Sequence, residues 1–161
     1  MNKISISVPG CNGRMGKTLV HLILENSKYE IASATCLPND DEVGVDIGLF
    51  AGKNKINREI SDEPFSLFQN SHVLIDFTVP DATMFHAKEC YNNKMPIVIG
   101  TTGLNDDQEK ELLSLSKKIP IVYSANFSID VNLLSSLVSK ATKTLGFDWD
   151  IEVLEMHHKQ K

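Results

Sequence analysis

Three glycines at three-residue intervals separate the first two apolar segments of the chain. Residues 4–8 alternate between isoleucine or valine and serine, as in a strand, and residues 14–26 carry leucine and isoleucine at helical spacing. Gly10, Gly13 and Gly16 mark the connection. Glycine there permits a tight turn, brings backbone N–H groups close to a phosphate, and lets the helix approach the strand. The chain is therefore predicted to begin with a strand, a tight turn and a helix.

Short β-rich runs and helical stretches alternate along the rest of the chain. The further predicted strands are residues 31–35, 72–77, 96–99, 119–123 and 149–156, with a weak one near 56–60. The further predicted helices are a short one through Phe68, one capped by Asp81, one opened by a capping box of Asn105 and Gln108, and one over 130–145 that ends at Gly146.

This alternation is typical of a parallel sheet with helices on both faces. We predict an α/β fold with a doubly wound, mostly parallel sheet of Rossmann type. Residues 1–129 are expected to form a dinucleotide-binding domain, and residues 130–161 the start of an incomplete α+β domain. So short a tail cannot bury a core of its own. It is therefore expected to pack on the first domain or on another subunit, or to be incomplete.

Composition excludes several classes of protein. The net charge of −5 argues against a broad basic surface for nucleic acid, and no apolar run approaches the roughly 18 residues of a membrane span. The three cysteines are widely spaced and form no zinc or disulfide pattern, so a reducing cytoplasm is expected. His157 and His158 lack a third ligand nearby, so no metal site is predicted.

The glycine loop favours binding of a dinucleotide, although a strand-to-helix turn without a ligand has the same pattern. Asn12 stands where a second glycine is common, and asparagine tolerates left-handed geometry. Residues 35–38 lack the acid that usually binds the ribose of NAD, while Asp40 and Asp41 lie slightly beyond. Arg14 and Lys17 are either partners of an NADP phosphate or surface charges. The choice between NADH and NADPH therefore stays open.

Five motifs follow one another in a distinctive order. They are the glycine loop with its Gly-Arg-Met-Gly core, residues 75–78 (IDFT), residues 98–103 (VIGTTG), residues 124–128 (SANFS) and residues 151–161 (IEVLEMHHKQK). Over the whole chain this order and spacing resemble the dihydrodipicolinate reductase family. The resemblance implies hydride transfer from NADH or NADPH to a cyclic unsaturated dicarboxylate, giving tetrahydrodipicolinate in lysine and diaminopimelate biosynthesis.

The resemblance also implies roles for individual residues. His157 would be the acid/base, Lys161 a second proton donor, and His158 a substrate-binding residue. These types suit the chemistry, because histidine titrates near neutrality and lysine neutralises a carboxylate. The implied cofactor-binding residues are Gly10, Cys11, Asn12, Gly13, Arg14, Met15, Gly100, Thr101, Thr102, Ser124, Ala125, Asn126 and Phe127.

Four further expectations concern single residues and the end of the chain. Asp76 either shapes the cofactor crevice or caps the next turn, Cys11 is read as a small loop residue, and Trp149 as a core or interface residue.

In the family, a segment that binds substrate carboxylates follows position 161, together with a second domain that forms homotetramers. We therefore expect a fragment or an interrupted gene product, inactive alone. The alternative is a dinucleotide-binding module without catalysis.

Overall fold

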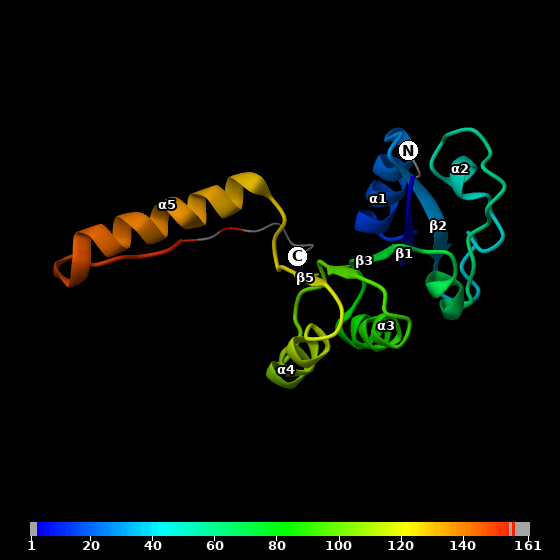
Figure 1. Ribbon diagram of the computed structural model, residues 1–161. Helices are drawn as coiled ribbons and strands as arrows, with labels where there is room; N and C mark the ends of the chain where they lie inside the picture. The colour runs from blue at the N-terminus through cyan, green and yellow to red at the C-terminus, as the bar shows by residue number, and fades with distance from the viewer. Residues whose placement is uncertain (1–2, 155, 157–161) are drawn as a thin grey trace. The chain divides into compact units, whose positions relative to one another are not determined.

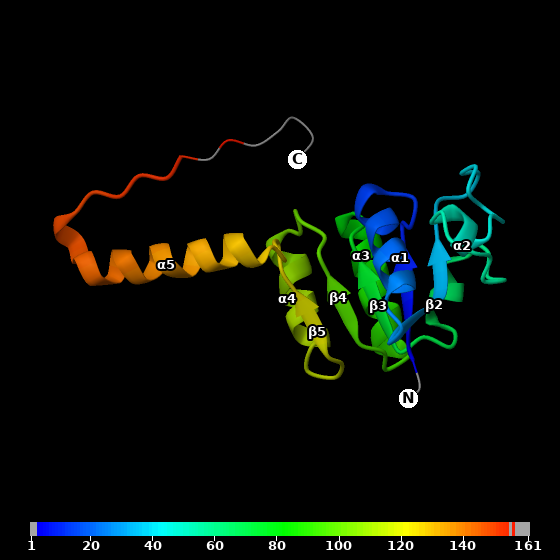
Figure 2. The same ribbon diagram turned by 90° about the horizontal axis from the view of Figure 1, so that it is seen from above.

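The computed structural model describes residues 3–154 and 156. In this part of the chain, parallel strands form one sheet in the order β2-β1-β3-β4-β5 (Figure 2). The strands are β1 (Ile4–Pro9), β2 (Tyr29–Thr35), β3 (Val73–Asp76), β4 (Ile97–Ile99) and β5 (Ile121–Tyr123). The predicted parallel sheet is confirmed, and β1 pairs with a strand on each side.

Helices cover both faces of this sheet. Figure 1 shows α1 on one face and α3 and α4 on the other. The helices of this unit are α1 (Arg14–Glu25), α2 (Ile47–Phe50), α3 (Pro80–Asn92) and α4 (Asp106–Leu115), with a 3₁₀ helix η1 (Pro64–Phe68). This arrangement confirms the doubly wound α/β fold.

The apolar side chains of the sheet pack into two buried clusters. In one cluster, Val20 of α1 packs with Val8 and Ile31 of β1 and β2. In the other, Leu74 and Ile97 of β3 and β4 pack with side chains of α3 and α4. A strand that is covered on both faces needs apolar residues at consecutive positions. The sequences of β3 and β4 are accordingly nearly continuous apolar runs.

Local capping signals differ in how well they predicted helix starts. The capping box of Asn105 and Gln108 is confirmed, because each side chain accepts from the backbone N–H of the other residue. The prediction that Asp81 caps α3 is wrong. Val79 is the N-cap, and Asp81 lies within the first turn after Pro80. Proline suits the first helical position, because the N–H that it lacks would have no partner there.

Residues 37–60 are organised around one carboxylate. Asp46 is buried and accepts hydrogen bonds from the backbone N–H groups of Gly48, Leu49, Ile56 and Arg58. Burial alone would raise the pKa of Asp46, but these four donors hold it below its ordinary value. The hydrogen bonds from Gly48 and Leu49 cap the start of α2, and those from Ile56 and Arg58 hold the following loop against the same carboxylate. The weak strand predicted near 56–60 is reduced to an isolated bridge between Asp46 and Glu59.

The chain divides into two compact units, residues 1–125 and 126–161. The second contains α5 (Ile129–Leu145) and a 3₁₀ helix η2 (Gly146–Asp148), and Gly146 ends α5 with φ of +75° as predicted. The strand predicted over 149–156 is wrong, because its described residues, 149–154 and 156, form none. A strand requires a partner for its backbone groups, and the described part of this unit contains no other strand.

Within residues 3–154 and 156, no helix combines the length and the apolar character that a bilayer crossing requires.

Candidate functional site

The first unit has a cleft where the chain changes its direction across the sheet. From β1 the chain passes through α1 to β2 on one side, whereas β3 pairs with the other side of β1. Connections leave the carboxyl ends of β1 and β3 in opposite directions, and this divergence opens a crevice. The cleft has a volume of about 490 Å³. It is lined by Pro9, Gly10, Asn12, Gly13, Thr35, Cys36, Leu37, Pro38, Asp62, Pro64, Phe77, Thr78, Val79, Ala82 and His86.

The glycine loop forms one wall of this cleft. Gly10 has φ of +61°, which favours glycine, and its carbonyl accepts a hydrogen bond of 3.0 Å from the Gly13 N–H. Gly13 is the N-cap of α1 and supplies no side-chain cap. The first N–H groups of a helix have no partner within the helix, and the helix dipole makes this end positive. The start of α1 therefore suits an anionic group.

Gly16 permits the close packing of α1 on the loop. A Cβ atom at this position would lie 2.1 Å from the Gly10 carbonyl oxygen and 2.7 Å from the Cα of Cys11. Both contacts are with backbone, which cannot move aside as a flexible side chain can. At Gly13 the nearest atom would be 3.3 Å away, so that position is less crowded. Gly16 thus sets the approach of the helix, and Gly13 borders the cleft.

Asn12 has a different role from the one its type suggested. The left-handed residue of the loop is Gly10, and Asn12 is not among the positive-φ residues of the described chain. Its side-chain Nδ2 instead donates to Asp40 Oδ2 at 2.9 Å and to Glu42 Oε2 at 3.4 Å. Asparagine tolerates left-handed geometry, but Asn12 does not use it, because Gly10 already supplies the turn. Asn12 links the glycine loop to the segment after β2.

Cys11 is an unreactive loop residue, as predicted. Its side chain is fully buried, and it is a free cysteine. Burial, followed by the negative potential of Cys36 and Glu42, raises the pKa of its thiol to about 12. The thiol therefore stays protonated at neutral pH and fills space beneath the loop.

The remaining predicted cofactor residues lie at three places. Arg14 and Met15 begin α1. Gly100 follows β4; its N–H donates to the Asp76 carbonyl at 2.8 Å, and a Cβ there would lie 2.1 Å from the Phe77 ring. Thr101 is buried beyond it, whereas Thr102 is exposed. Ser124 and Ala125 follow β5, whereas Asn126 and Phe127 belong to the second unit. The structure does not describe His157, His158 or Lys161.

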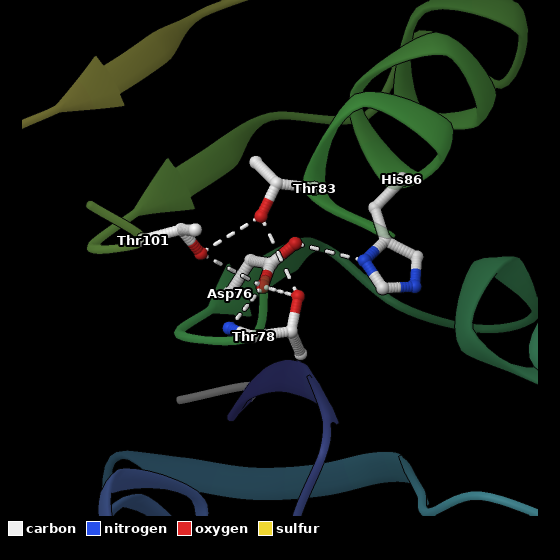
Figure 3. A network of polar contacts seen from close by, with 5 residues as sticks. All are labelled: Asp76, Thr78, Thr83, His86 and Thr101. Atoms are coloured by element: carbon white, nitrogen blue, oxygen red, sulfur yellow. Dashed lines mark hydrogen bonds and ion pairs between the residues drawn. The ribbon is translucent and has the colours of Figure 1, made fainter. Parts of the chain in front are cut away.

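A buried polar network joins the ends of β3 and β4 to α3, as Figure 3 shows. Asp76 is fully buried; its Oδ1 accepts from the backbone N–H and the hydroxyl of Thr78 at 2.8 and 2.6 Å. Its Oδ2 lies 2.8 Å from Nδ1 of His86. The Thr83 hydroxyl bonds the Thr101 hydroxyl at 2.7 Å, and Thr101 Oγ1 lies 3.5 Å from Asp76. Asp76 therefore caps the turn after β3 and contacts Thr78 and His86, two residues that line the cleft.

Sequence reasoning missed Thr83 and His86 in this network. The two residues are three positions apart on α3, so they lie on the same face of the helix. That spacing places polar side chains on an otherwise apolar, buried helix face. This spacing was the feature of the sequence that could have identified the network, since buried polar groups are paired in native proteins.

Asp76→Ala should lower the free energy of unfolding by about 3 kcal/mol, because it leaves the partly buried donors of Thr78 and the buried His86 ring without their partner. Urea unfolding of the variant and the unchanged protein measures the difference. Asp81→Ala is the matched control: this carboxylate is exposed on the first turn of α3, and its loss should cost less than about 1 kcal/mol. Equal losses for the two variants would contradict a stabilising role of the network.

In residues 3–154 and 156, no three histidine, cysteine or acidic side chains are grouped as a metal centre would require.

The sheet order, the glycine-rich connection and the cleft between β1 and β3 together define a Rossmann-type domain. The family model described as dihydrodipicolinate reductase, N-terminus, matches residues 4–127. Since this match covers well over half of the chain, the chain belongs to the dihydrodipicolinate reductase family.

Individual relatives agree with this assignment. The chain is 38% identical to 4-hydroxy-tetrahydrodipicolinate reductase of Rhizobium meliloti, with all of this chain and 66% of that protein covered. It is 39% identical to the protein of the same name from Pseudoalteromonas atlantica, with 100% and 60% covered. The chain thus spans slightly less than two thirds of the length of these relatives.

Solved structures show the same fold. Dipicolinate-bound dihydrodipicolinate reductase from Paenisporosarcina sp. TG-14 aligns with a TM-score of 0.67 at 25% identity, covering 87% of this chain and 54% of that one. An oxidoreductase from Agrobacterium radiobacter, in complex with NAD+, L-tartaric acid and magnesium, aligns with a TM-score of 0.66. It covers 87% of this chain and 41% of that one at 12% identity, a likeness in fold alone.

Proposed function

We propose that this chain is the cofactor-binding part of a 4-hydroxy-tetrahydrodipicolinate reductase that uses NADH or NADPH. The glycine-rich loop carries this proposal, since it opens onto the cleft with the start of α1 free of a side-chain cap. Relatives of that name are 38–39% identical along the whole of this chain. The alternative, a binding module without catalysis, has no observation of its own in its favour.

The geometry of the loop supports dinucleotide binding. The crowded Gly16 and the left-handed Gly10 keep the backbone close to the cleft, and the start of α1 would bind the pyrophosphate. When bound, the nicotinamide supplies a hydride to the substrate. Gly100 to Thr102 and Ser124 to Phe127 would then border the nicotinamide. In this arrangement Thr101 acts as a positioning residue, because its hydroxyl is bonded to Thr83.

Proton transfer falls to residues beyond the cofactor domain. His157 would supply the proton that balances hydride transfer, with Lys161 as a second donor and His158 as a contact of the substrate. A lysine and two histidines also suit a dicarboxylate substrate, whose negative charges require compensation. These assignments rest on the family motif.

Several properties of the complete protein belong to the same proposal. Residues 126–161 would begin the domain that binds the substrate and forms homotetramers. The substrate is a small cyclic dicarboxylate that becomes tetrahydrodipicolinate, and neither nucleic acid nor membrane is a partner. The three free, buried cysteines suit a cytoplasmic enzyme of lysine and diaminopimelate biosynthesis.

Gly13→Val should weaken NADH binding at least about 100-fold, equivalent to about 2.8 kcal/mol, because the new side chain would occupy the space through which the backbone approaches the pyrophosphate. Quenching or enhancement of NADH fluorescence in a titration measures the dissociation constant. Thr18→Val on the exposed side of α1 is the control and should bind as the unchanged protein does. Undiminished affinity of the Gly13 variant would refute the loop assignment.

A reductase assay performed beside this titration tests the reaction itself. The complete protein should bind NADH and convert substrate. Binding without turnover by the complete protein would favour the non-catalytic module.

A further inference from the structure

The second unit begins with a turn that is closed by a side chain. Asn126 Oδ1 accepts a hydrogen bond of 2.8 Å from the backbone N–H of Ser128, two residues further along. An asparagine side chain that bonds the backbone in this way forms a compact turn. Phe127 is the central residue of this turn, and the turn leads directly into α5.

One side chain of α5 bonds both ends of the turn. Asn132 Nδ2 donates to the carbonyl oxygen of Asn126 at 3.0 Å and to that of Ser128 at 2.7 Å. The side-chain nitrogen of asparagine carries two hydrogens, so these two bonds use both of them. The two carbonyl groups belong to the residues on either side of Phe127. Asn132 therefore fastens the turn to the helix on both sides of this residue.

The start of α5 is built on the same turn. Ser128 is the N-cap; its hydroxyl accepts from the Val131 N–H at 3.4 Å and donates to the Asp130 carboxylate. The bond from this hydroxyl lowers the pKa of Asp130, so the carboxylate is ionised at the positive end of the helix. The backbone N–H of Asn132 donates to the Ser128 carbonyl at 3.1 Å. The turn and the start of α5 thus form one hydrogen-bonded unit.

The side chain of Asn132 serves the turn rather than the helix. Asparagine is unfavourable inside helices, because its side chain competes with the helical hydrogen bonds of the backbone. The Asn126 carbonyl precedes the N-cap of α5, so its bond to Asn132 is not part of the helical pattern. Asn132 directs its donors to the segment before the helix.

We propose that Asn132 is a positioning residue for hydride transfer, because its two hydrogen bonds hold the turn of residues 126–128 in one conformation. The proposal rests on the proposed function, in which Asn126 and Phe127 border the nicotinamide. Asn132 would act through these two residues. Loss of both bonds would let the turn shift, and a displacement of about 1 Å at a reacting centre can slow a reaction by about 10².

Two variants of the complete protein test this role. Asn132→Asp keeps the shape of the side chain but replaces the donor nitrogen with an acceptor oxygen, and Asn132→Leu removes both donors without adding charge. Each variant should lower kcat about tenfold or more. The dissociation constant for NADH should stay within about threefold, since the proposed pyrophosphate site lies in the other unit. The isotope effect from NADH deuterated at C4 of the nicotinamide should not decrease, because hydride transfer is the step that is slowed.

Stability measurements distinguish positioning from a merely structural role. A negative charge near the start of α5 is favourable to the helix dipole, so Asn132→Asp should unfold at the same urea concentration as the unchanged protein. Asn26→Asp is the matched control. Asn26 is exposed, and its Oδ1 accepts from the Lys28 N–H at 3.0 Å, a bond that aspartate retains. Its kcat should equal that of the unchanged protein.

The outcomes separate this proposal from the one on which it rests. An unchanged kcat in both Asn132 variants would overturn the positioning role while leaving the proposed function intact. A loss of kcat with aspartate but not with leucine would show an effect of charge and would overturn it as well. So would a smaller isotope effect, or a loss of kcat that accompanies unfolding at lower urea in both variants. If the unchanged complete protein neither binds NADH nor converts substrate, the proposed function fails together with this role.

Discussion

Gly16→Val is expected to destabilise the first unit by at least about 3 kcal/mol and to abolish NADH binding. The Cβ atom alone would lie 2.1 Å from the Gly10 carbonyl oxygen, so α1 must move away from the loop. That displacement would also remove the start of α1 from the cleft, where the pyrophosphate is proposed to bind. Urea unfolding and NADH titration of the same samples measure the two effects.

The contrast with a neighbouring position makes this test specific. Thr18→Ala changes an exposed residue of α1 whose hydroxyl donates to the Arg14 carbonyl of its own helix, so it should change stability by less than about 0.5 kcal/mol. A Gly16 variant as stable as the Thr18 variant would show that α1 does not need this close approach.

His157→Ala in the complete enzyme is expected to lower kcat by about 10² or more, because hydride transfer leaves electron density that a general acid must protonate. The affinity for NADH should stay within about twofold, since the proposed pyrophosphate site lies in the other unit. Steady-state kinetics and NADH titration separate the two quantities.

His21→Ala is the matched control for this variant. His21 is exposed on α1 and pairs with Glu25 at 3.1 Å, so its loss should leave kcat unchanged. A kcat near that of the unchanged enzyme in the His157 variant would remove this residue from the mechanism. A fall in NADH affinity alone would assign it to binding.

Much of the fold could be predicted from the sequence, because the relevant signals are local. The serine and isoleucine alternation of β1, the capping box at Asn105 and the glycine that ends α5 each depend on residues within a few positions. Part of the loop geometry was equally accessible, since Gly16 meets a backbone atom only six residues earlier. The strand predicted over 149–156 failed because an alternating pattern supplies no partner strand.

The candidate site could be predicted only in part. The glycine loop was recognisable in the sequence, and this loop forms one wall of the cleft. The link from Asn12 to Asp40 spans 28 residues, and the bond from Thr83 to Thr101 spans 18. Neither hydrogen bond produces a periodic pattern of residues in the sequence. The sequence motifs also placed the proposed catalytic residues, which lie outside the described part of the chain.

The sequence by itself determined the parallel architecture, the glycine-rich connection and the family, because each depends on residue types at short, fixed spacings. The tertiary structure alone decided which side chains meet at the cleft. Asp40 reaches the glycine loop and His86 reaches Asp76 only after β1, β2, β3 and α3 have packed together. Such contacts depend on the path of the whole chain, since hydrogen bonds form between atoms that are close in space, whatever their separation in sequence.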